Sequence, residues 1–443
     1  MTSSGLRAPR PTAAGEAWER RRLGPLAASA IVVANMIGAG LFTTSGFALA
    51  DLGDPRAVVA AWLVGGVVAL CGALSYGGIA HRIPESGGEA TYLGAAVHPA
   101  VGFLAGWVSV FAGFAGPIAA SALAFEVYLE TALGVRLPHG VVGGALIAAV
   151  AALHALRPHL GTASLTGMVL LKLALLVTLV TWGASYPPGS AQITPSGFRA
   201  GAFAVTLVWI SFSYSGWNGA VYLAGEIRDP GRNLARVLWM PTLGVAVLYA
   251  VTNAVFLRTG DAAVLAGRAD FLAAAAGGLG GEWVERGVAA LVALALLTSV
   301  SVMVLSGPRV LVRLARDGIV PRALARGRVA PAAAIACQAA VAIAILAAAG
   351  LAELIAALGY ALGLSASAVV GVAMWLRRRE GPDRVPIPGH PWVPLVFVVV
   401  TVATSAFLVV RNPAEAALGT AFLLSGLPAY AIFRGVRRSG AGL

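Results

Sequence analysis

The feature that most limits how this chain can fold is a succession of long apolar runs covering almost the whole sequence. Each run is long enough to cross the ~30 Å hydrocarbon core of a bilayer as a helix. The sequence therefore predicts an all-α polytopic membrane protein. Its twelve predicted transmembrane helices lie near residues 25–50, 57–80, 89–129, 139–156, 161–183, 197–224, 235–257, 285–314, 331–350, 353–376, 392–411 and 414–433.

Composition excludes the other structural classes. Of the 443 residues, 58% are hydrophobic and 11% charged, whereas soluble domains carry ~25% charged residues. Disordered chains need low hydrophobicity and high charge. Outer-membrane barrels show a weaker, ~10-residue alternating pattern. Neither description fits this chain.

The basic residues indicate how the chain is oriented. The net charge is +12, but the cations lie in short loops between apolar runs, so we expect the lipid bilayer and no nucleic acid as partner. Most arginines fall in alternate loops on the side of both termini, which predicts cytoplasmic termini in the cytoplasmic (inner) membrane. The first run is too long for the apolar region of a signal peptide, so the first span is expected to be uncleaved.

No metal or cofactor site is expected. Cys71 and Cys337 each lie inside an apolar run, where a free thiol packs as a small hydrophobic group. The sequence has no Cys-x-x-C motif and no His/Cys cluster.

Two predicted spans contain interruptions rich in Gly, Ser, Thr and Asn, at residues 35–46 and 209–219. Glycine in a helix costs ~1 kcal/mol relative to alanine, and unwound backbone in a membrane needs hydrogen-bond partners that lipid cannot supply. Each interruption alone is equally compatible with close helix packing by small residues.

The paired position of the interruptions favours a binding site. They occur in spans one and six, the first members of two five-span halves, and such pairs point to the site of a transporter. Half-helix N-termini suit a carboxylate, and exposed carbonyls suit an ammonium group. The sequence therefore predicts a site that can bind both ends of a zwitterion without a charged side chain.

The chain resembles the amino acid–polyamine–organocation superfamily, specifically amino-acid permeases related to the L-type and cationic amino-acid transporters. The resemblance covers most of the first ten spans. It rests on four ordered motifs: residues 37–42 in span one, residues 83–88 after span two, the span-six block formed by residues 213–218 and 225–233, and residues 309–318 at the end of span eight.

The resemblance implies a LeuT-like 5+5 inverted repeat, with spans one and six unwound at mid-membrane. Residues 1–22 and 434–443 would be cytoplasmic tails, residues 23–183 and 197–376 the two repeats, residues 377–391 a cytoplasmic loop and residues 392–433 two peripheral spans. It also implies the substrate contacts. These are Met36, Ile37, Gly38, Ala39, Gly40, Phe212, Ser213 and Ser215, with Phe212 as the gate that closes over substrate.

Lys172, the chain's one lysine, lies in the middle of span five. A charge at that depth is costly and usually marks function. The resemblance implies that Lys172 can replace a bound sodium ion, contacting span-one carbonyls and a span-eight hydroxyl, for which Ser299 and Ser301 are candidates. The predicted role is coupling to protons or to gating; the alternative is a structural cation that ties two helices together.

Other polar residues carry weaker predictions. Glu226, Asp229 and Arg232 are expected to pair as an inner gate or loop anchor. His81 and His154 are expected to have a solvated or interfacial role near cytoplasmic span ends, and Glu126 has no assigned role. No acidic side chain is predicted near the interruptions, which favours neutral substrates.

The sequence thus predicts a secondary active transporter of neutral L-amino acids, working by alternating access as a proton symporter or exchanger and independent of sodium. The substrate is a small molecule and protons are a possible co-substrate; the oligomeric state is not predicted. Transport of cationic amino acids or polyamines, a channel and a non-transporting sensor are the alternatives. An enzyme is not expected, because no mid-membrane dyad or hydrolase motif occurs, and the sequence contains no nucleotide-binding loop of an ATP-driven pump.

Overall fold

The computed structural model describes residues 23–156, 163–187, 197–316, 320, 322–325 and 332–438. Over these residues the chain is helical, and the described backbone contains no strand beyond one isolated bridge between Leu23 and Ile227. The predicted tail 1–22 and residues 317–318 of the span-eight motif lie outside the described residues.

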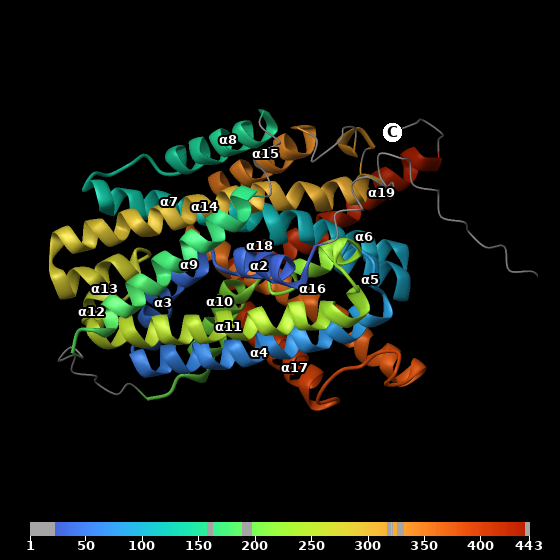
Figure 1. Ribbon diagram of the computed structural model, residues 1–443, viewed down its shortest axis with the longest axis horizontal. Coiled ribbons are helices and arrows are strands. Elements are labelled where there is room, and N and C mark those ends of the chain that lie inside the picture. The colour runs from blue at the N-terminus through green and yellow to red at the C-terminus, as the bar shows by residue number, and fades with distance from the viewer. Residues whose placement is uncertain are drawn as a thin grey trace, which may run out of the picture.

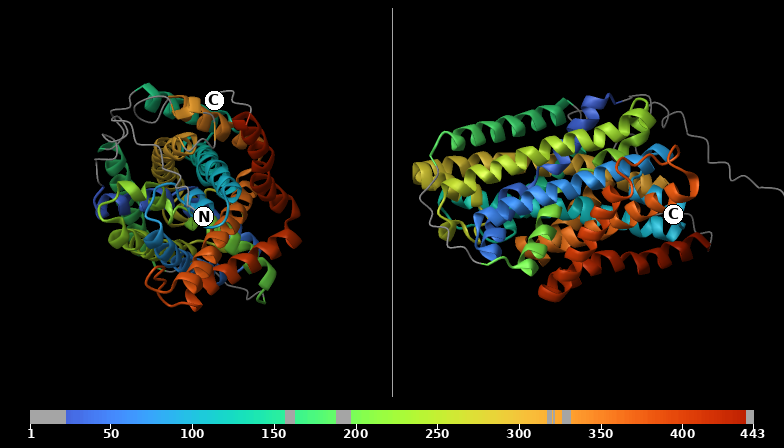
Figure 2. Two further views of the ribbon diagram at one scale, coloured as in Figure 1. Left: turned by 90° about the vertical axis from the view of Figure 1, so that its right-hand side faces the viewer. Right: turned by 90° about the horizontal axis from the view of Figure 1, so that it is seen from below.

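The helices run side by side along a common direction, as Figures 1 and 2 show. Their bounds are α2 Pro25–Met36, α3 Ala39–Leu52, α4 Pro55–Arg82, α5 Glu89–Ala96, α6 Pro99–Val108, η1 Ser109–Ala115, α7 Gly116–Leu133, α8 Val141–Leu156, α9 Ala163–Ala184, α10 Ala200–Tyr214, η3 Gly219–Glu226, α11 Pro230–Thr259, α12 Ala262–Leu265, α13 Phe271–Gly280, α14 Glu282–Arg316, η4 Arg322–Ala325, α15 Ala332–Ala348, α16 Leu351–Glu380, α17 Trp392–Arg411, α18 Pro413–Leu424 and α19 Gly426–Arg438.

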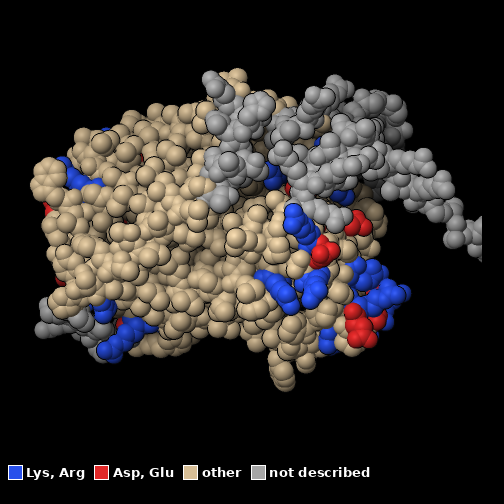
Figure 3. Space-filling model, viewed as in Figure 1, with Lys and Arg blue, Asp and Glu red and all other residues tan. Residues whose placement is uncertain are grey.

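Nine helical segments of the described chain are long and apolar enough to cross a membrane. Two further predicted spans correspond to the shorter apolar helices α8 and α15. Charged side chains gather toward the two ends of the face in Figure 3, and the surface between them is mostly uncharged. We call the end that holds α5 and α6 the tail end, since Leu23 also lies there, and the end that holds α12 and α13 the loop end (Figure 1).

The predicted third span, residues 89–129, is too long for one upright helix, and the structure divides it. Helix α5 ends at Ala96, and α6 begins at Pro99 with the His98 imidazole accepting a hydrogen bond from the N–H of Ala100. The proline at the first turn suits a helix start, because its missing N–H would have no helical partner there. Only α6, η1 and α7 form the long span, and η1 is a π-helical segment within it.

Four pairs of helices that lie far apart in the sequence pack closely against each other. Helix α4 lies along α11, α7 along α14, α8 along α15, and α3 against α10. Small residues permit these close approaches. At Gly77 on α4, for example, an added Cβ would lie 3.0 Å from the Ala235 side chain on α11.

Candidate functional site

The first span breaks where its sequence was predicted to interrupt the helix. Helix α2 ends at Met36, Ile37 and Gly38 are extended, and α3 starts at Ala39. No side chain caps the N-terminus of α3 at Gly38. The first N–H groups of α3 therefore have no side-chain acceptor, which leaves them available to an anion.

The sixth span breaks at the matching position. Helix α10 ends at Tyr214, Ser215 is extended and Gly216 has φ 97°. Only glycine adopts that conformation without strain, and a Cβ on Gly216 would lie 2.7 Å from the Asn35 carbonyl. A Cβ on Gly219 would likewise lie 2.7 Å from the Asn35 side-chain amide. The two breaks therefore touch each other through Asn35.

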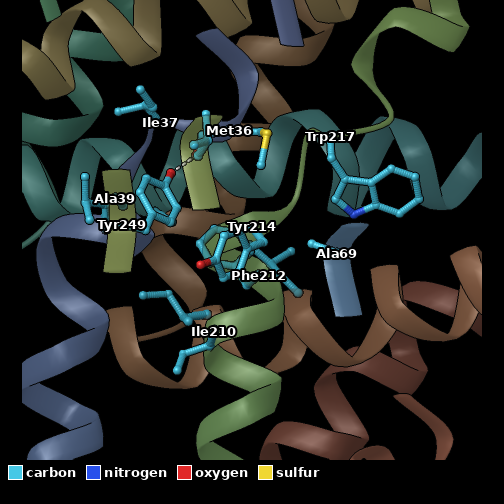
Figure 4. Packing of buried hydrophobic residues seen from close by; sticks show 14 of the residues in the cluster. Met36, Ile37, Ala39, Ala69, Ile210, Phe212, Tyr214, Trp217 and Tyr249 are labelled. Carbon is cyan, nitrogen blue, oxygen red and sulfur yellow. Dashed lines mark hydrogen bonds between the residues drawn. The ribbon is translucent and has the colours of Figure 1, made fainter. Parts of the chain in front are cut away.

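The carbonyls released by the first break are held by side chains from three other helices. The Tyr249 hydroxyl of α11 donates to the Met36 carbonyl at 2.6 Å, drawn as a dashed line in Figure 4. Lys172 of α9, 1% exposed, donates from Nζ to the Ile37 carbonyl at 2.8 Å and to Ser299 Oγ of α14 at 2.8 Å. The Ser299 hydroxyl lies 3.1 Å from the same Ile37 carbonyl.

Ser301 does not contact Lys172. It lies two residues after Ser299 on α14, so its side chain points about 200° around the helix axis from that of Ser299. Its Oγ lies 2.7 Å from Nε2 of His154, which is buried, whereas the sequence predicted a solvated or interfacial side chain. His154 and Ser301 thus join α8 to α14 on another face of α14. His81 Nδ1 lies 2.9 Å from the Gly231 carbonyl, and the carboxylate of Glu126 accepts the N–H groups of Gly140 and Gly143.

On the loop side of the breaks, α3 and α10 are in tight contact. A Cβ on Gly40 would lie 2.5 Å from Cα of Ser213, and Thr44 Oγ1 lies 2.9 Å from Ser213 Oγ. Farther out, the N–H of Gly267 donates to the Gly46 carbonyl at 2.8 Å. The structure is therefore closed between the breaks and the loop end.

A cavity of about 100 Å³ lies beside the breaks. Ser215 and Asn218 at the second break and Asn35 at the first contribute polar groups to its wall. The remaining wall is mostly apolar, with residues from α4, η1, α10, α14, α16 and α17 such as Phe114, Val208, Met303, Leu362 and Phe397.

Of the eight predicted substrate contacts, Ser215 lines this cavity. Phe212, the predicted gate, is 5% exposed and lies beside Tyr214 and Ile210 in the packed interior (Figure 4). Met36, Ile37, Gly38, Ala39 and Gly40 form the first break or begin α3, and all are buried with Ser213. The predicted residues are thus near one another, and the cavity lies next to them.

The expectation that no acidic group lies near the breaks was wrong. Glu89, the first residue of α5, is 3% exposed and lines the cavity. Its carboxylate accepts hydrogen bonds from Tyr222 at 2.5 Å, from Tyr76 at 3.1 Å and from the Asn218 amide. One signal could have found it, because an ionisable residue at the edge of an apolar span is a candidate for function.

The loop motif before Glu89 docks onto η3. Gly88 has φ 61°, and a Cβ there would lie 2.5 Å from the Tyr222 ring. The Ser86 hydroxyl accepts the N–H of Gly225 at 2.9 Å. The Ser-Gly-Gly sequence is therefore explained by the close approach of this loop to the tail-side half of the broken sixth span.

Comparison with known proteins agrees with this architecture. Residues 23–433 match the family described as "Amino acid permease". The chain is 26% identical to the large neutral amino acids transporter small subunit 2 of Oryctolagus cuniculus, over 93% of this chain and 80% of that protein. It is 25% identical to the serine/threonine exchanger SteT of Bacillus subtilis, over 93% and 96% of the two chains.

A third relative, the Asc-type amino acid transporter 1 of Mus musculus, is 25% identical over 93% of this chain and 81% of its own length. These relatives are transporters and not enzymes, and the match to the family spans nearly all the described helices. This chain is accordingly a multi-pass membrane protein of the amino acid permease family, within the amino acid–polyamine–organocation superfamily, and is related to the L-type transporters and SteT.

Proposed function

We propose that the protein moves neutral L-amino acids across the cytoplasmic membrane by alternating access, as an exchanger or proton symporter that does not require sodium. The observation that carries the proposal is the contact between the two breaks, where Asn35 meets Gly216 and Gly219. Free N–H groups at the start of α3 suit the substrate carboxylate, and the carbonyls at the breaks suit its ammonium group.

The packing of the helices supports an inverted-repeat fold with twelve spans. The four pairs α3 with α10, α4 with α11, α7 with α14 and α8 with α15 each join equivalent members of the two halves. In this proposal residues 23–183 and 197–376 form the repeats, residues 377–391 a cytoplasmic loop and residues 392–433 two peripheral spans. The tail end would face the cytoplasm, since Arg82, Arg316 and Arg377 to Arg379 end helices there.

The position of Lys172 supports sodium independence. Its ammonium group occupies the space between Ile37 and Ser299, so a charge is already present where span one meets span eight. In the proposal Lys172 couples the break in span one to α14, and Met36 to Gly40, Phe212, Ser213 and Ser215 become substrate contacts when the site rearranges.

Neutral substrates are favoured over cationic ones by two observations. The relatives named above are a large neutral amino acids transporter and a serine/threonine exchanger. The Glu89 carboxylate near the site is already engaged by Tyr76, Asn218 and Tyr222. A cationic side chain would have to displace these donors.

A thermal-shift screen of the purified protein against the twenty amino acids tests the proposal. A ligand that binds the folded form raises Tm. At a ligand concentration of 100 times Kd, the free energy of unfolding increases by ~2.7 kcal/mol. Exchange in proteoliposomes should then saturate, be stimulated by internal substrate and be unchanged when choline replaces sodium. Binding without flux would identify a sensor, and flux that does not saturate would identify a channel.

A further inference from the structure

Glu89 is a buried charge that the proposed substrate site does not use. Its carboxylate accepts hydrogen bonds from Tyr76, Asn218 and Tyr222, and Ser109 Oγ lies 3.5 Å away. All of these groups are neutral. A buried carboxylate needs such donors to stay ionised, because unpaired burial costs several kcal/mol.

No cation balances this charge within the described part of the chain. No lysine or arginine nitrogen there lies within 4.0 Å of the Glu89 carboxylate. The titratable groups around it are the phenols of Tyr76 on α4, Tyr92 on α5 and Tyr222 on η3. Two arginines of α14 lie in the same region, where Arg313 approaches Gly87 and Arg309 is attracted to Glu226 of η3.

Other charged groups near α5 lie at its far end. Helix α16 packs on α5, and its Arg379 and Glu380 line a separate hollow with Ala95 and Ala96. Ala95 and Ala96 lie six and seven residues along α5 from Glu89, so this hollow is at the other end of the helix. The carboxylate is therefore a single ionisable site in a neutral polar shell, at the wall of the cavity.

The three donors belong to parts that must separate if the cavity opens toward the tail end. Asn218 and Tyr222 belong to the broken sixth span, Tyr76 belongs to α4, and Glu89 begins α5. An ionised carboxylate accepts from all three. When the carboxyl group is protonated, one of its oxygens becomes an O–H donor and accepts hydrogen bonds less well. The hydrogen bonds from Tyr76, Asn218 and Tyr222 are therefore weaker in the protonated form.

We propose that Glu89 binds a proton during the transport cycle: the ionised carboxylate holds η3 closed against α5, and protonation from the tail-side solution releases it. The inference rests on the proposed transport function. It adds a proton-binding site 83 residues before Lys172 in the sequence, on a different helix and on the other side of the second break.

The test is exchange of radiolabelled L-leucine and L-serine by the full-length protein in proteoliposomes, with equal pH inside and outside, from pH 5.5 to 8.5. We expect the wild-type rate to rise as the pH falls. In Glu89→Gln that rise should be lost, with rates within about twofold across the range. Glu126→Gln is the matched control, since Glu126 is also buried but takes its hydrogen bonds from the N–H groups of Gly140 and Gly143, with the His139 imidazole 4.0 Å away, and it should keep the wild-type profile.

Tyr222→Phe tests the inference without changing the carboxylate. Removing one donor to the charged form should move the midpoint of the pH profile upward by about one unit. This variant decides the matter if Glu89→Gln does not fold.

Several results would overturn the inference. They are a wild-type rate independent of pH, a wild-type profile in Glu89→Gln, an unmoved midpoint in Tyr222→Phe, or a changed KM for serine alone with the profile intact, which would make Glu89 a substrate contact. If neither amino acid is exchanged and no amino acid raises Tm, the transport function itself fails and this inference falls with it.

Discussion

At the scale of single residues, Lys172 is the group on which the closed arrangement most depends. It joins α9 to the break in the first span and to α14 through two hydrogen bonds of 2.8 Å. Hydrogen bonds from a charged donor are worth about 1.5–3 kcal/mol each, and losing one also leaves a buried carbonyl unpaired.

We therefore expect Lys172→Ala to lower the exchange rate in proteoliposomes at least about tenfold, which corresponds to ~1.4 kcal/mol. Sodium should not restore it. A variant that kept the full rate and the wild-type pH dependence would show that Lys172 has no role in coupling and is a structural cation.

The two serines of α14 provide a finer comparison. Ser299→Ala removes the hydroxyl between Lys172 and the Ile37 carbonyl, so exchange should fall several-fold. Ser301→Ala removes the partner of His154 and should lower Tm while leaving the rate per folded molecule near wild type. Equal rate losses in the two variants would contradict the assignment of Ser299 to the lysine site.

At the scale of helices, the contact between α3 and α10 closes the protein toward the loop end. Gly40 permits it, because a Cβ there would lie 2.5 Å from Cα of Ser213. That neighbour is backbone and cannot turn aside. Overpacking of this kind typically costs about 1–3 kcal/mol.

Gly40→Ala should consequently lower Tm and slow exchange. Gly167→Ala is its control, since Gly167 lies in α9 with nothing within 4 Å of an added Cβ. Alanine there should leave Tm unchanged or raise it slightly, by up to ~1 kcal/mol of stability. A similar fall in both variants would mean that the close contact is not what Gly40 provides.

The helices were largely predictable from sequence, because their apolar runs match the thickness of a bilayer and their interruptions contain glycine. Both helix breaks fall within the predicted segments 35–46 and 209–219. The separate helix α5 was missed since the apolar pattern continues through it. His98 and Pro99 carried the helix-start signal that divides the run.

The site was less predictable, because burial and partners depend on which helices meet. The cavity beside the breaks draws its wall from α16 and α17 as well as from the predicted spans. Nothing local to Glu89 says that Tyr76, 13 residues away, and Tyr222, 133 residues away, will surround it. Which of the two serines, Ser299 or Ser301, faces Lys172 likewise depends on how α14 is rotated about its axis.

At the scale of the whole molecule, the loop end is held by an ion-pair network that joins the segment before α13 to the ends of α7 and α14. Arg268 donates to Asp270 at 2.8 Å through Nε and to Glu285 at 2.8 Å, and Thr131 donates to Asp270 at 2.7 Å. Burial raises the pKa of the Asp270 carboxyl, but the hydrogen bonds from Arg268 and Thr131 and the charge of Arg268 outweigh it. The net pKa is lowered.

Because the folded pKa of Asp270 lies below its unfolded value, its contribution to stability is present above about pH 4 and is lost as the pH falls through the folded pKa. Asp270→Asn should lower the free energy of unfolding by about 1–3 kcal/mol at pH 7, and the gap to wild type should narrow toward pH 3. Asp261→Asn is the control, since asparagine caps a helix as well as aspartate does. A gap that stayed constant with pH would contradict the ionised role of Asp270.

The isolated bridge at the tail end links the two broken spans in a further way. Leu23 donates its N–H to the Glu226 carbonyl at 2.6 Å and accepts the N–H of Arg228 at 3.0 Å, just before α2 begins and just after η3 ends. The start of α2 and the end of η3 are thereby joined by two main-chain hydrogen bonds, which only a substitution that removes an N–H, such as proline, would break. We therefore expect α2 and η3 to move together in any rearrangement that displaces one of them.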